Sequence, residues 1–308
     1  MKQTVAAVVV TRNRKELLVR CLRAILDQSY AVDRIFVIDN ASSDGTPQML
    51  ESLDFMKHPQ LEYVRLTENI GGAGGFHEGI KLAYDRGFDW LWLMDDDGFP
   101  YPTSLEKLMN MTGRYQFLGP LVVVDSHNLS FVFPWRKSIF PFPWCDSVIS
   151  RVSEAEAIAS DGCIVGRISP FNGTLISRQM VATIGCPKKE FFIWGDEFEY
   201  YMRAVRAGYV PVTVCAARHH HPPSRMKRIR LPMRLGSFAA PEDKFRLYLY
   251  VRNYSYIHTR YISFNSVAFC VKCLILAASD YKRIWIIMMG LFDGLVGYWG
   301  RAKKFQCS

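Results

Sequence analysis

Asp89-Trp90-Leu91-Trp92-Leu93-Met94-Asp95-Asp96-Asp97-Gly98 is the stretch of this 308-residue chain that decides its fold. The apolar run within it has the length of a buried strand, and it stops at three consecutive carboxylates. Asp is a poor strand residue and adjacent carboxylates repel one another, so a cation is expected at this strand end. Asp95 and Asp97 can project to the same side, and Mg²⁺ or Mn²⁺ takes such oxygen ligands while leaving positions for phosphate oxygens. An acidic surface turn at Asp97-Gly98 is the alternative.

Three further strands are expected upstream of this one. The first is a continuous apolar run, the other two are strand-length segments rich in apolar residues, and helical stripes of apolar residues lie between them. The runs are Val5–Val10, Arg34–Ile38 and Leu61–Leu66. Four strands alternating with helices predict an α/β fold with an open, mostly parallel sheet and flanking helices.

Polar clusters follow every one of these strands at its carboxyl end. Ligands of open parallel sheets bind at that edge, so the coincidence of the clusters carries more weight than any single motif. The clustered residues are Thr11, Arg12 and Asn13, then Asp39 and Asn40, then Asn69, and finally Asp95, Asp96 and Asp97.

Glycines crowd the segment after the third strand, at Gly71, Gly72, Gly74 and Gly75. Their spacing does not match the dinucleotide fingerprint, and they follow the third strand rather than the first. One interpretation is a close approach of the backbone to a bound diphosphate, with amides at the start of the next helix as donors. The other is a flexible turn before a helix over residues 76–85.

Two later segments carry further candidate groups. Asp196-Glu197 opens a helix, where the two acids either serve the chemistry or complement the helix dipole. Glu199 and Arg203 are four residues apart, so we expect them to pair on that helix. A strand over residues 209–214 precedes three consecutive histidines, residues 219–221, which are candidate metal ligands in a chain with a carboxylate cluster.

The composition changes after residue 223, which predicts a domain of residues 1–223 and a basic, aromatic, helical region of residues 224–308. Five cations lie within residues 224–234, and two apolar helical segments follow within residues 262–300. Apolar helix faces beside cations suit an anionic membrane surface, and an ordinary packed bundle is the alternative. We see neither a secretory signal nor a run of about 18 apolar residues, so we expect a cytoplasmic protein, peripheral on the cytoplasmic face of the membrane.

The formal net charge of +9 is compatible with nucleic acid, anionic lipid or a phosphorylated substrate. A nucleic-acid-binding protein is disfavoured, because the acidic strand end would repel phosphate unless a cation were bound. A non-catalytic membrane scaffold is disfavoured, because both acidic segments are intact. The eight cysteines lack zinc-site spacing, which indicates reduced thiols in the cytosol.

Four motifs together resemble glycosyltransferase family 2, the inverting nucleotide-sugar glycosyltransferases with a GT-A fold. The motifs occur in the family's order, and the resemblance covers roughly residues 3 to 225. They are Val-Val-Val-Thr-Arg-Asn-Arg at 8–14, Val-Ile-Asp-Asn-Ala-Ser-Ser-Asp-Gly-Thr at 37–46, Asn-Ile-Gly-Gly-Ala-Gly-Gly-Phe at 69–76 and Leu-Met-Asp-Asp-Asp-Gly at 93–98. The glycine motif with the triple Asp looks most like the galactofuranosyltransferases, with rhamnosyltransferases next.

The resemblance implies a role for each candidate residue. A divalent cation, Mn²⁺ or Mg²⁺, would be held by Asp95, Asp97 and one histidine, for which counting from the strand favours His221 and then His220. Asp196 and Glu197 both remain candidates for the general base that takes the acceptor's proton, with a slight preference for Glu197. The nucleotide sugar would contact Thr11, Arg12, Asn13, Asp39, Asn40, Asn69, Gly71, Gly72, Gly74, Gly75, Asp95 and Asp96.

The implied reaction is the metal-dependent, inverting transfer of a sugar to a glycan or lipid-linked acceptor in cell-surface polysaccharide synthesis. UDP-galactofuranose is the expected donor, and a rhamnosyltransferase that uses dTDP-rhamnose is the alternative. The expected partners are the nucleotide sugar, the acceptor and an anionic membrane surface, with no nucleic acid. A homo-oligomer is left open.

Overall fold

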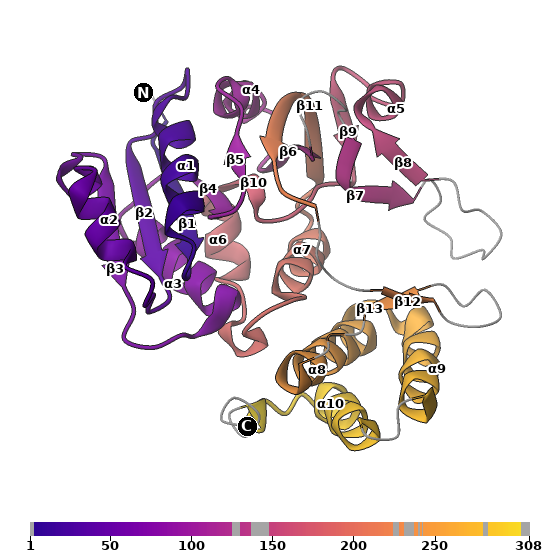
Figure 1. Cartoon of the computed structure of the whole chain (residues 1–308). Helices are drawn as coiled ribbons and strands as arrows, with labels where there is room; N and C mark the ends of the chain where they lie inside the picture. Colours follow the sequence, from indigo (N-terminus) through magenta and orange to yellow (C-terminus); the bar gives the residue numbers. More distant parts are fainter. Residues whose placement is uncertain are drawn as a thin grey trace.

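The computed structural model of this chain describes residues 3–124, 130–136, 148–223, 228–230, 237–239, 241, 243–279 and 283–302. Four parallel strands form one half of the main sheet, in the order β3-β2-β1-β4 (Figure 1). They are β1 (Val5–Thr11), β2 (Arg34–Asp39), β3 (Leu61–Arg65) and β4 (Trp90–Asp95). This half confirms the predicted parallel α/β sheet. The strand order reverses between β1 and β4, and open sheets bind ligands at such a switch point.

The other half of the sheet is mixed. β10 (Asn172–Ser177) runs antiparallel to β4 and leads on to β6 (Phe117–Val123), β11 (Pro211–His220) and β5 (Phe99–Pro100). Three short strands extend this side: β7 (Ser130–Arg136), β8 (Val148–Arg151) and β9 (Cys163–Val165). Because β11 pairs with β5, which follows the acids directly, the histidines lie beside the acidic run.

Two helical layers cover the sheet, and β1 shows how they do so. All its residues are buried, and alternate residues enter different cores, since successive strand side chains point to opposite faces. Val5, Ala7 and Val9 share a core with α1 (Lys15–Leu26), α2 (Thr46–Ser52), the short helix η1 (Phe55–Lys57) and α4 (Ser104–Met109). Ala6, Val8 and Val10 share the other with α3 (Gly71–Asp85), α6 (Arg178–Ile184) and α7 (Asp196–Arg206). The short helices α5 (Val152–Glu156) and η2 (Lys189–Phe191) complete the fold of this domain.

Two predicted element boundaries are wrong. α3 begins at Gly71 rather than at residue 76, so the glycines are helical and do not form a flexible turn. A Cβ on Gly75 would lie 2.5 Å from Cγ1 of Val10, so the missing side chain lets α3 pack against β1. β11 continues to His220 instead of ending at residue 214, because its pairing with β6 resumes after a register shift.

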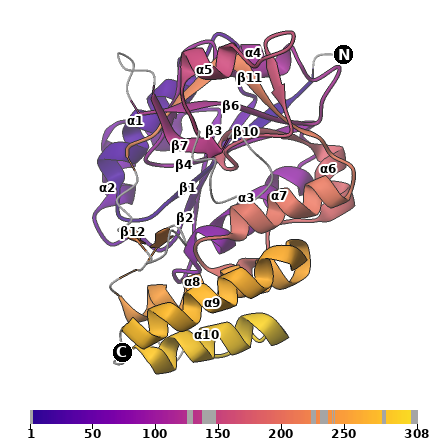
Figure 2. The same cartoon turned by 90° about the vertical axis from the view of Figure 1, so that its right-hand side faces the viewer.

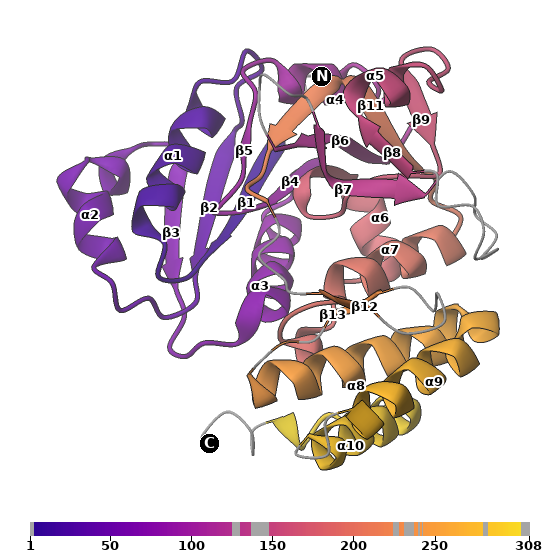
Figure 3. The same cartoon turned by 45° about the vertical axis from the view of Figure 1, so that its right-hand side comes forward.

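Three helices form a bundle near the carboxyl end: α8 (Lys244–Tyr261), α9 (Ser263–Ser279) and α10 (Ile284–Val296). We call the main sheet with its covering helices the sheet domain. Helix α8 lies between the sheet domain and the helices α9 and α10 (Figures 2 and 3), and the three helices of the bundle contribute to one buried core. A hairpin of β12 (Arg228–Arg230) and β13 (Ser237–Ala239) precedes the bundle. In the described ranges no helix combines the length and the apolar character that crossing a membrane requires. Apart from β12, the basic run of 224–234 lies outside the described residues, and the boundary at residue 223 stays a prediction.

Candidate active site

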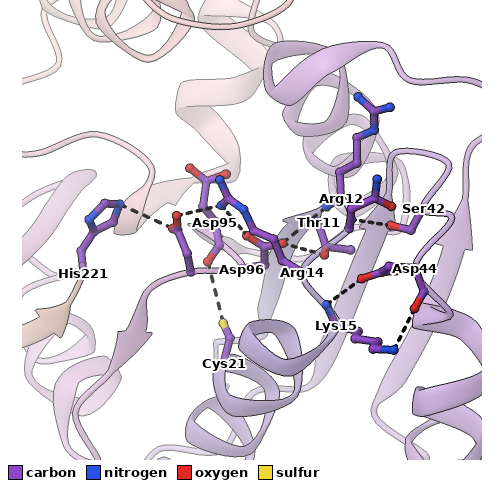
Figure 4. A network of polar contacts seen from close by, with 12 residues as sticks. Thr11, Arg12, Arg14, Lys15, Cys21, Ser42, Asp44, Asp95, Asp96 and His221 are labelled. Atoms are coloured by element: carbon purple, nitrogen blue, oxygen red, sulfur yellow. Dashed lines mark hydrogen bonds and ion pairs between the residues drawn. The ribbon is translucent and has the colours of Figure 1, made fainter. Parts of the chain in front are cut away.

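Residues from the end of β1 hold the acidic edge, which we define as Asp95, Asp96 and Asp97. Figure 4 shows Asp95 and Asp96 beside Thr11 and Arg14. Thr11 donates its hydroxyl to Asp96 at 2.7 Å, and the guanidinium of Arg14 lies 3.0 Å from Asp96 and 2.7 Å from Asp97. Arg14 was not among the predicted site residues, although it belongs to the motif at residues 8–14. The signal that could have found it is the need of three adjacent carboxylates for a nearby cation.

The negative charges of the acidic edge are crowded. Burial, followed by the charges of Asp97 and Asp96, raises the pKa of Asp95 well above its usual range. Burial raises the pKa of Asp96 to about 6, although Arg14 opposes the shift. Burial disfavours the charge of Arg14, but Asp96 and Asp97 outweigh this effect and raise the pKa of its guanidinium. Burial and crowded negative charge therefore disfavour the ionised forms of Asp95 and Asp96, and a bound cation would offset this effect.

Asp97 and His221 have donor atoms that fit a divalent cation. Oδ1 of Asp97 is buried and accepts no hydrogen bond from any described residue, and Nε2 of His221 lies 3.5 Å from it. Nδ1 of His221 lies 2.6 Å from the carbonyl oxygen of Pro222, which assigns the proton to Nδ1 and leaves the lone pair on Nε2. Among the described residues, no three His, Cys, Asp or Glu side chains already converge as a closed metal site.

The other two histidines make different contacts. The ring of His220 stacks on Phe99, with the ring centroids 4.4 Å apart. His219 is fully buried, and burial lowers its pKa to about 3, so its ring is neutral. The ring of His221 lies beside Asp97 of the acidic edge, and counting from the strand had favoured this histidine; its role as a metal ligand stays a prediction.

The predicted nucleotide-binding residues of the first two strands divide into buried and exposed ones. Asp39 is fully buried, and its carboxylate accepts a hydrogen bond from the hydroxyl of Tyr63. Asn40 is buried too, and its side chain bonds to backbone groups at the start of α3. Arg12 and Asn13 have exposed side chains. Asp39 and Asn40 therefore join β2 to its surroundings, while Arg12 and Asn13 lie open to solvent.

Asn69 and the predicted glycines form the start of α3. Oδ1 of Asn69 accepts a hydrogen bond from the amide of Gly71 at 3.0 Å. A Cβ on Gly71, Gly74 or Gly75 would come within 2.0 to 2.6 Å of a neighbouring heavy atom, so these three glycines allow close packing. A Cβ on Gly72 would meet nothing within 4 Å. Of the four, Gly72 is the one whose backbone adjoins open space.

The amino-terminal turn of α7 carries the second group of acids. Asp196 is buried, and burial, followed by the charge of Glu197 and a hydrogen bond with it, raises the pKa of Asp196 well above its usual range. Glu197 contributes to the raised pKa of Asp95, and Asp95 to that of Asp196, so the two acidic segments share one space. The predicted pair of Glu199 and Arg203 is confirmed at 2.9 Å.

Known proteins share this sequence pattern. Residues 6–175 match the family described as glycosyl transferase family 2. The chain is 34% identical over 223 residues to the galactofuranosyltransferase GlfT1 of Mycolicibacterium smegmatis, with 71% of each chain covered. It is 30% identical over 262 residues to the galactofuranosyltransferase GlfT1 of Mycobacterium tuberculosis, with 83% of each chain covered.

The fold is similar to that of a solved structure, the crystal structure of GalNAc-T7 with UDP, GalNAc and Mn²⁺. The TM-score is 0.54 at 14% sequence identity, which is a likeness of fold alone. The match covers 83% of this chain and 50% of that one, so this chain spans about half the length of that protein. The sequence of the present chain places it in glycosyl transferase family 2, and the chain is a glycosyltransferase with a GT-A fold.

Proposed function

We propose that this glycosyltransferase transfers galactofuranose from UDP-galactofuranose to a glycan or lipid-linked acceptor, with inversion at the anomeric carbon. The observation that carries the proposal is the mutual electrostatic influence of the acidic edge and the acids of α7. Inverting transfer needs positive charge near the leaving diphosphate and a base near the attacking hydroxyl, and both must adjoin one sugar. The choice of donor is supported by two relatives that are named galactofuranosyltransferases.

The proposed reaction is a single displacement. The acceptor's hydroxyl oxygen forms a bond to the anomeric carbon while the bond from that carbon to the diphosphate oxygen breaks, and UDP leaves with the bonding electrons. Glu197 takes the hydroxyl proton. Because burial raises the pKa of Asp196 and so favours its protonated carboxyl, Asp196 can donate that proton to Glu197 in a hydrogen bond and orient it. Glu197 is therefore favoured over Asp196 as the base.

A divalent cation, Mn²⁺ or Mg²⁺, held by Asp95, Asp97 and His221 would neutralise charge on the diphosphate. This assignment is supported by the oxygen of Asp97 that accepts no hydrogen bond within the described part of the chain, and by the crowding of the carboxylates. Arg14 already contacts Asp96 and Asp97, and it would add a fixed positive charge beside the cation. The exposed side chains of β1 and the open backbone of the glycine segment are then left to contact the nucleotide: Arg12, Asn13 and Gly72.

A membrane surface is the proposed place of the reaction, on its cytoplasmic face. Residues 224–308 contain fifteen Lys and Arg against four Asp and Glu, whereas residues 1–223 contain 23 against 25. The excess positive charge of the chain therefore belongs entirely to the carboxyl-terminal region. Such a region is attracted to a membrane that contains anionic lipid, and the same membrane would present a lipid-linked acceptor.

Helices α9 and α10 lie on the side of the bundle turned away from the sheet domain (Figure 2), and both expose large apolar side chains, which we name the α9–α10 face. Its residues recur at helical spacing on both helices, so they can enter a lipid headgroup region together. They are Val267, Val271 and Leu274 on α9 and Ile284, Trp285, Met288, Phe292, Leu295 and Val296 on α10. Apolar residues beside an excess of cations fit an anionic membrane better than they fit water.

A donor screen with and without a divalent cation tests the proposed reaction. We expect UDP-galactofuranose with Mn²⁺ to raise the Tm and to support transfer, and a chelator to abolish both effects. Asp97→Asn should weaken UDP binding in Mn²⁺ by about tenfold or more, because it removes a charged ligand. Asp85→Asn is the matched control, since Asp85 forms an exposed pair with Lys81 on α3 and should leave UDP binding unchanged.

Each alternative has its own outcome in this screen. Transfer from dTDP-rhamnose, without transfer from UDP-galactofuranose, would replace the proposed donor. Calorimetry that gives equal UDP affinities in Mn²⁺ and in chelator would remove the metal from the proposal.

A further inference from the structure

The segment that leads into α7, residues 191–195, is strained, and we name it the entry turn. Phe192 and Trp194 have left-handed φ values of 65° and 64°. The amide of Ile193 donates to the carbonyl of Phe191 at 2.8 Å, which closes a γ-turn around Phe192. Residues other than glycine keep such conformations only where the surrounding structure holds them. Some group outside the entry turn must therefore hold it.

One side chain of α8 contacts three carbonyls of the entry turn. Nδ2 of Asn253 donates to the carbonyl oxygens of Phe191, Ile193 and Trp194, at 2.9, 2.9 and 2.8 Å. An amide nitrogen has only two protons, so one of them is shared between two of these acceptors. Asn253 is fully buried, so water cannot replace the bonds if they are lost.

Arg252 determines which way the amide of Asn253 points. Its Nε and Nη2 donate to Oδ1 of Asn253 at 2.9 and 2.8 Å, so the amide nitrogen must face the entry turn. Nη2 also donates to the carbonyl of Glu190 at 2.8 Å, one residue before the turn. With the amide reversed, its oxygen would face the three carbonyls and repel them. Arg252 therefore fixes the orientation of the buried Asn253 amide.

We propose that Asn253 is a positioning residue for sugar transfer: by holding the entry turn, it sets the direction in which α7 presents Asp196 and Glu197. The opposite side of the turn is held by α3, where the amide of Ala73 donates to the carbonyl of Phe192 at 3.1 Å. Displacement of a catalytic group by about 1 Å lowers a rate strongly, so a loosened turn should slow the reaction. This inference rests on the proposed base, and it gives the bundle a part in the reaction.

Asn253→Asp is the test, because it keeps the size of the side chain and removes both donor protons. We expect kcat to fall by about 10- to 100-fold while the donor KM and the UDP affinity change by less than about threefold. The acidic limb of the kcat–pH profile should move as well, because the base would lie in an altered environment. A role in stability alone would change none of these quantities per folded molecule.

Asp293→Asn is the matched control. Asp293 is fully buried in the same bundle, and its carboxylate bonds to Tyr248 at 2.7 Å and to Arg301 at 3.2 Å. The substitution also exchanges Asp and Asn, and it should lower the Tm while leaving kcat and the pH profile of the folded enzyme unchanged. If Asn253→Asp behaves in the same way as this control, the positioning role is wrong.

Arg252→Lys carries the same test if Asn253→Asp does not fold. Lysine keeps the positive charge but cannot hold the amide oxygen with two parallel bonds, so kcat should fall with KM nearly unchanged. An unchanged kcat in this variant overturns the proposal. The proposed base is tested separately: near-normal turnover in both Glu197→Gln and Asp196→Asn would remove the base, whatever the result at Asn253.

Discussion

The acidic edge and residue Glu199 of helix α7 both carry buried carboxylate oxygens, but their surroundings treat these oxygens in opposite ways. At the acidic edge, Asp97 keeps an oxygen without a hydrogen bond from any described residue, and the pKa of Asp95 is raised by burial and by its neighbours. On α7, Glu199 is fully buried, yet Arg203 pairs with it at 2.9 Å and the hydroxyl of Tyr261 donates to it at 2.7 Å. Unsatisfied buried carboxylates are expected where a ligand binds, and satisfied ones where the protein needs only its own structure.

Substitutions of the acids on α7 should have the largest effect on kcat, and they test the difference between these carboxylates most directly. Glu197→Gln should lower kcat by about 10²- to 10⁴-fold, because a general base acts on the acceptor's proton. UDP affinity should stay nearly unchanged, since the base does not hold the donor. Asp196→Asn should lower kcat as well, by weakening the orientation of Glu197. Rates with acceptor, measured beside calorimetry with UDP, give both quantities.

Glu199→Gln is the control for these two variants. It lies on the same helix and loses a charge beside Arg203, so it should lower the Tm and leave kcat per folded molecule intact. If Glu199→Gln reduced kcat as strongly as Glu197→Gln, the paired carboxylate of Glu199 would not be purely structural, and Glu197 would not be distinguished as the base.

The acidic edge was predictable because its signal is local. An apolar strand that ends in three carboxylates is visible in ten consecutive residues, and the parallel order of the first strands follows from their alternation with helices. The candidate ligand His221 could be counted from the preceding strand. Arg14 was missed because only the folded sheet brings the end of β1 beside the end of β4.

The hydrogen bonds between Asn253 and the entry turn were not predictable, because they join residues far apart in the chain. Asn253 sits 62 positions after Phe191, and nothing in the composition around either residue indicates that they meet. The start of α3 was misplaced for a related reason. Glycine weakens isolated helices, and only the packing of Gly71 and Gly75 against the rest of the protein explains a helix there.

The sheet domain and the carboxyl-terminal region also differ in charge, and vesicle binding tests whether this difference has a function. Binding to anionic vesicles should weaken as salt rises without vanishing, since each cation near the surface contributes about 1 kcal/mol and buried apolar side chains add a part that salt does not screen. The double variant Trp285→Ser with Phe292→Ser should bind about tenfold or more weakly, because both side chains are mostly exposed on the α9–α10 face. Sedimentation with vesicles measures this.

Ile158→Ser is the control for the vesicle experiment. Ile158 is 51% exposed, but it lies in the sheet domain, so its loss should not affect vesicle binding. UDP binding should be unchanged in all these variants, because the proposed nucleotide site is built from the first half of the chain. If the full-length protein ignores anionic vesicles at low salt, the α9–α10 face is not a membrane-docking surface.

The smallest expected effect concerns pH, where the bundle and the acidic edge should respond with opposite signs. His258 on α8 stacks on Phe269 with ring centroids 4.7 Å apart, and burial, followed by the charge of Lys272, lowers its pKa to about 4. At Asp96, by contrast, burial raises the pKa to about 6. A lowered histidine pKa disfavours protonation of the folded state, whereas a raised carboxyl pKa favours it.

The contribution of His258 to stability is therefore complete above about pH 6.5, the ordinary value for histidine, and it is lost as the pH falls towards about 4. Because the ring is partly exposed, we expect a loss on the order of 1 kcal/mol, well below the full value of the shift. Thermal unfolding across this pH range, compared between the native chain and His258→Phe, measures it. Phe keeps a ring against Phe269 and cannot titrate, so the Tm of this variant should fall less on acidification. An equal fall in both proteins would show that His258 does not titrate with unfolding, and that the acid sensitivity belongs to the carboxylates.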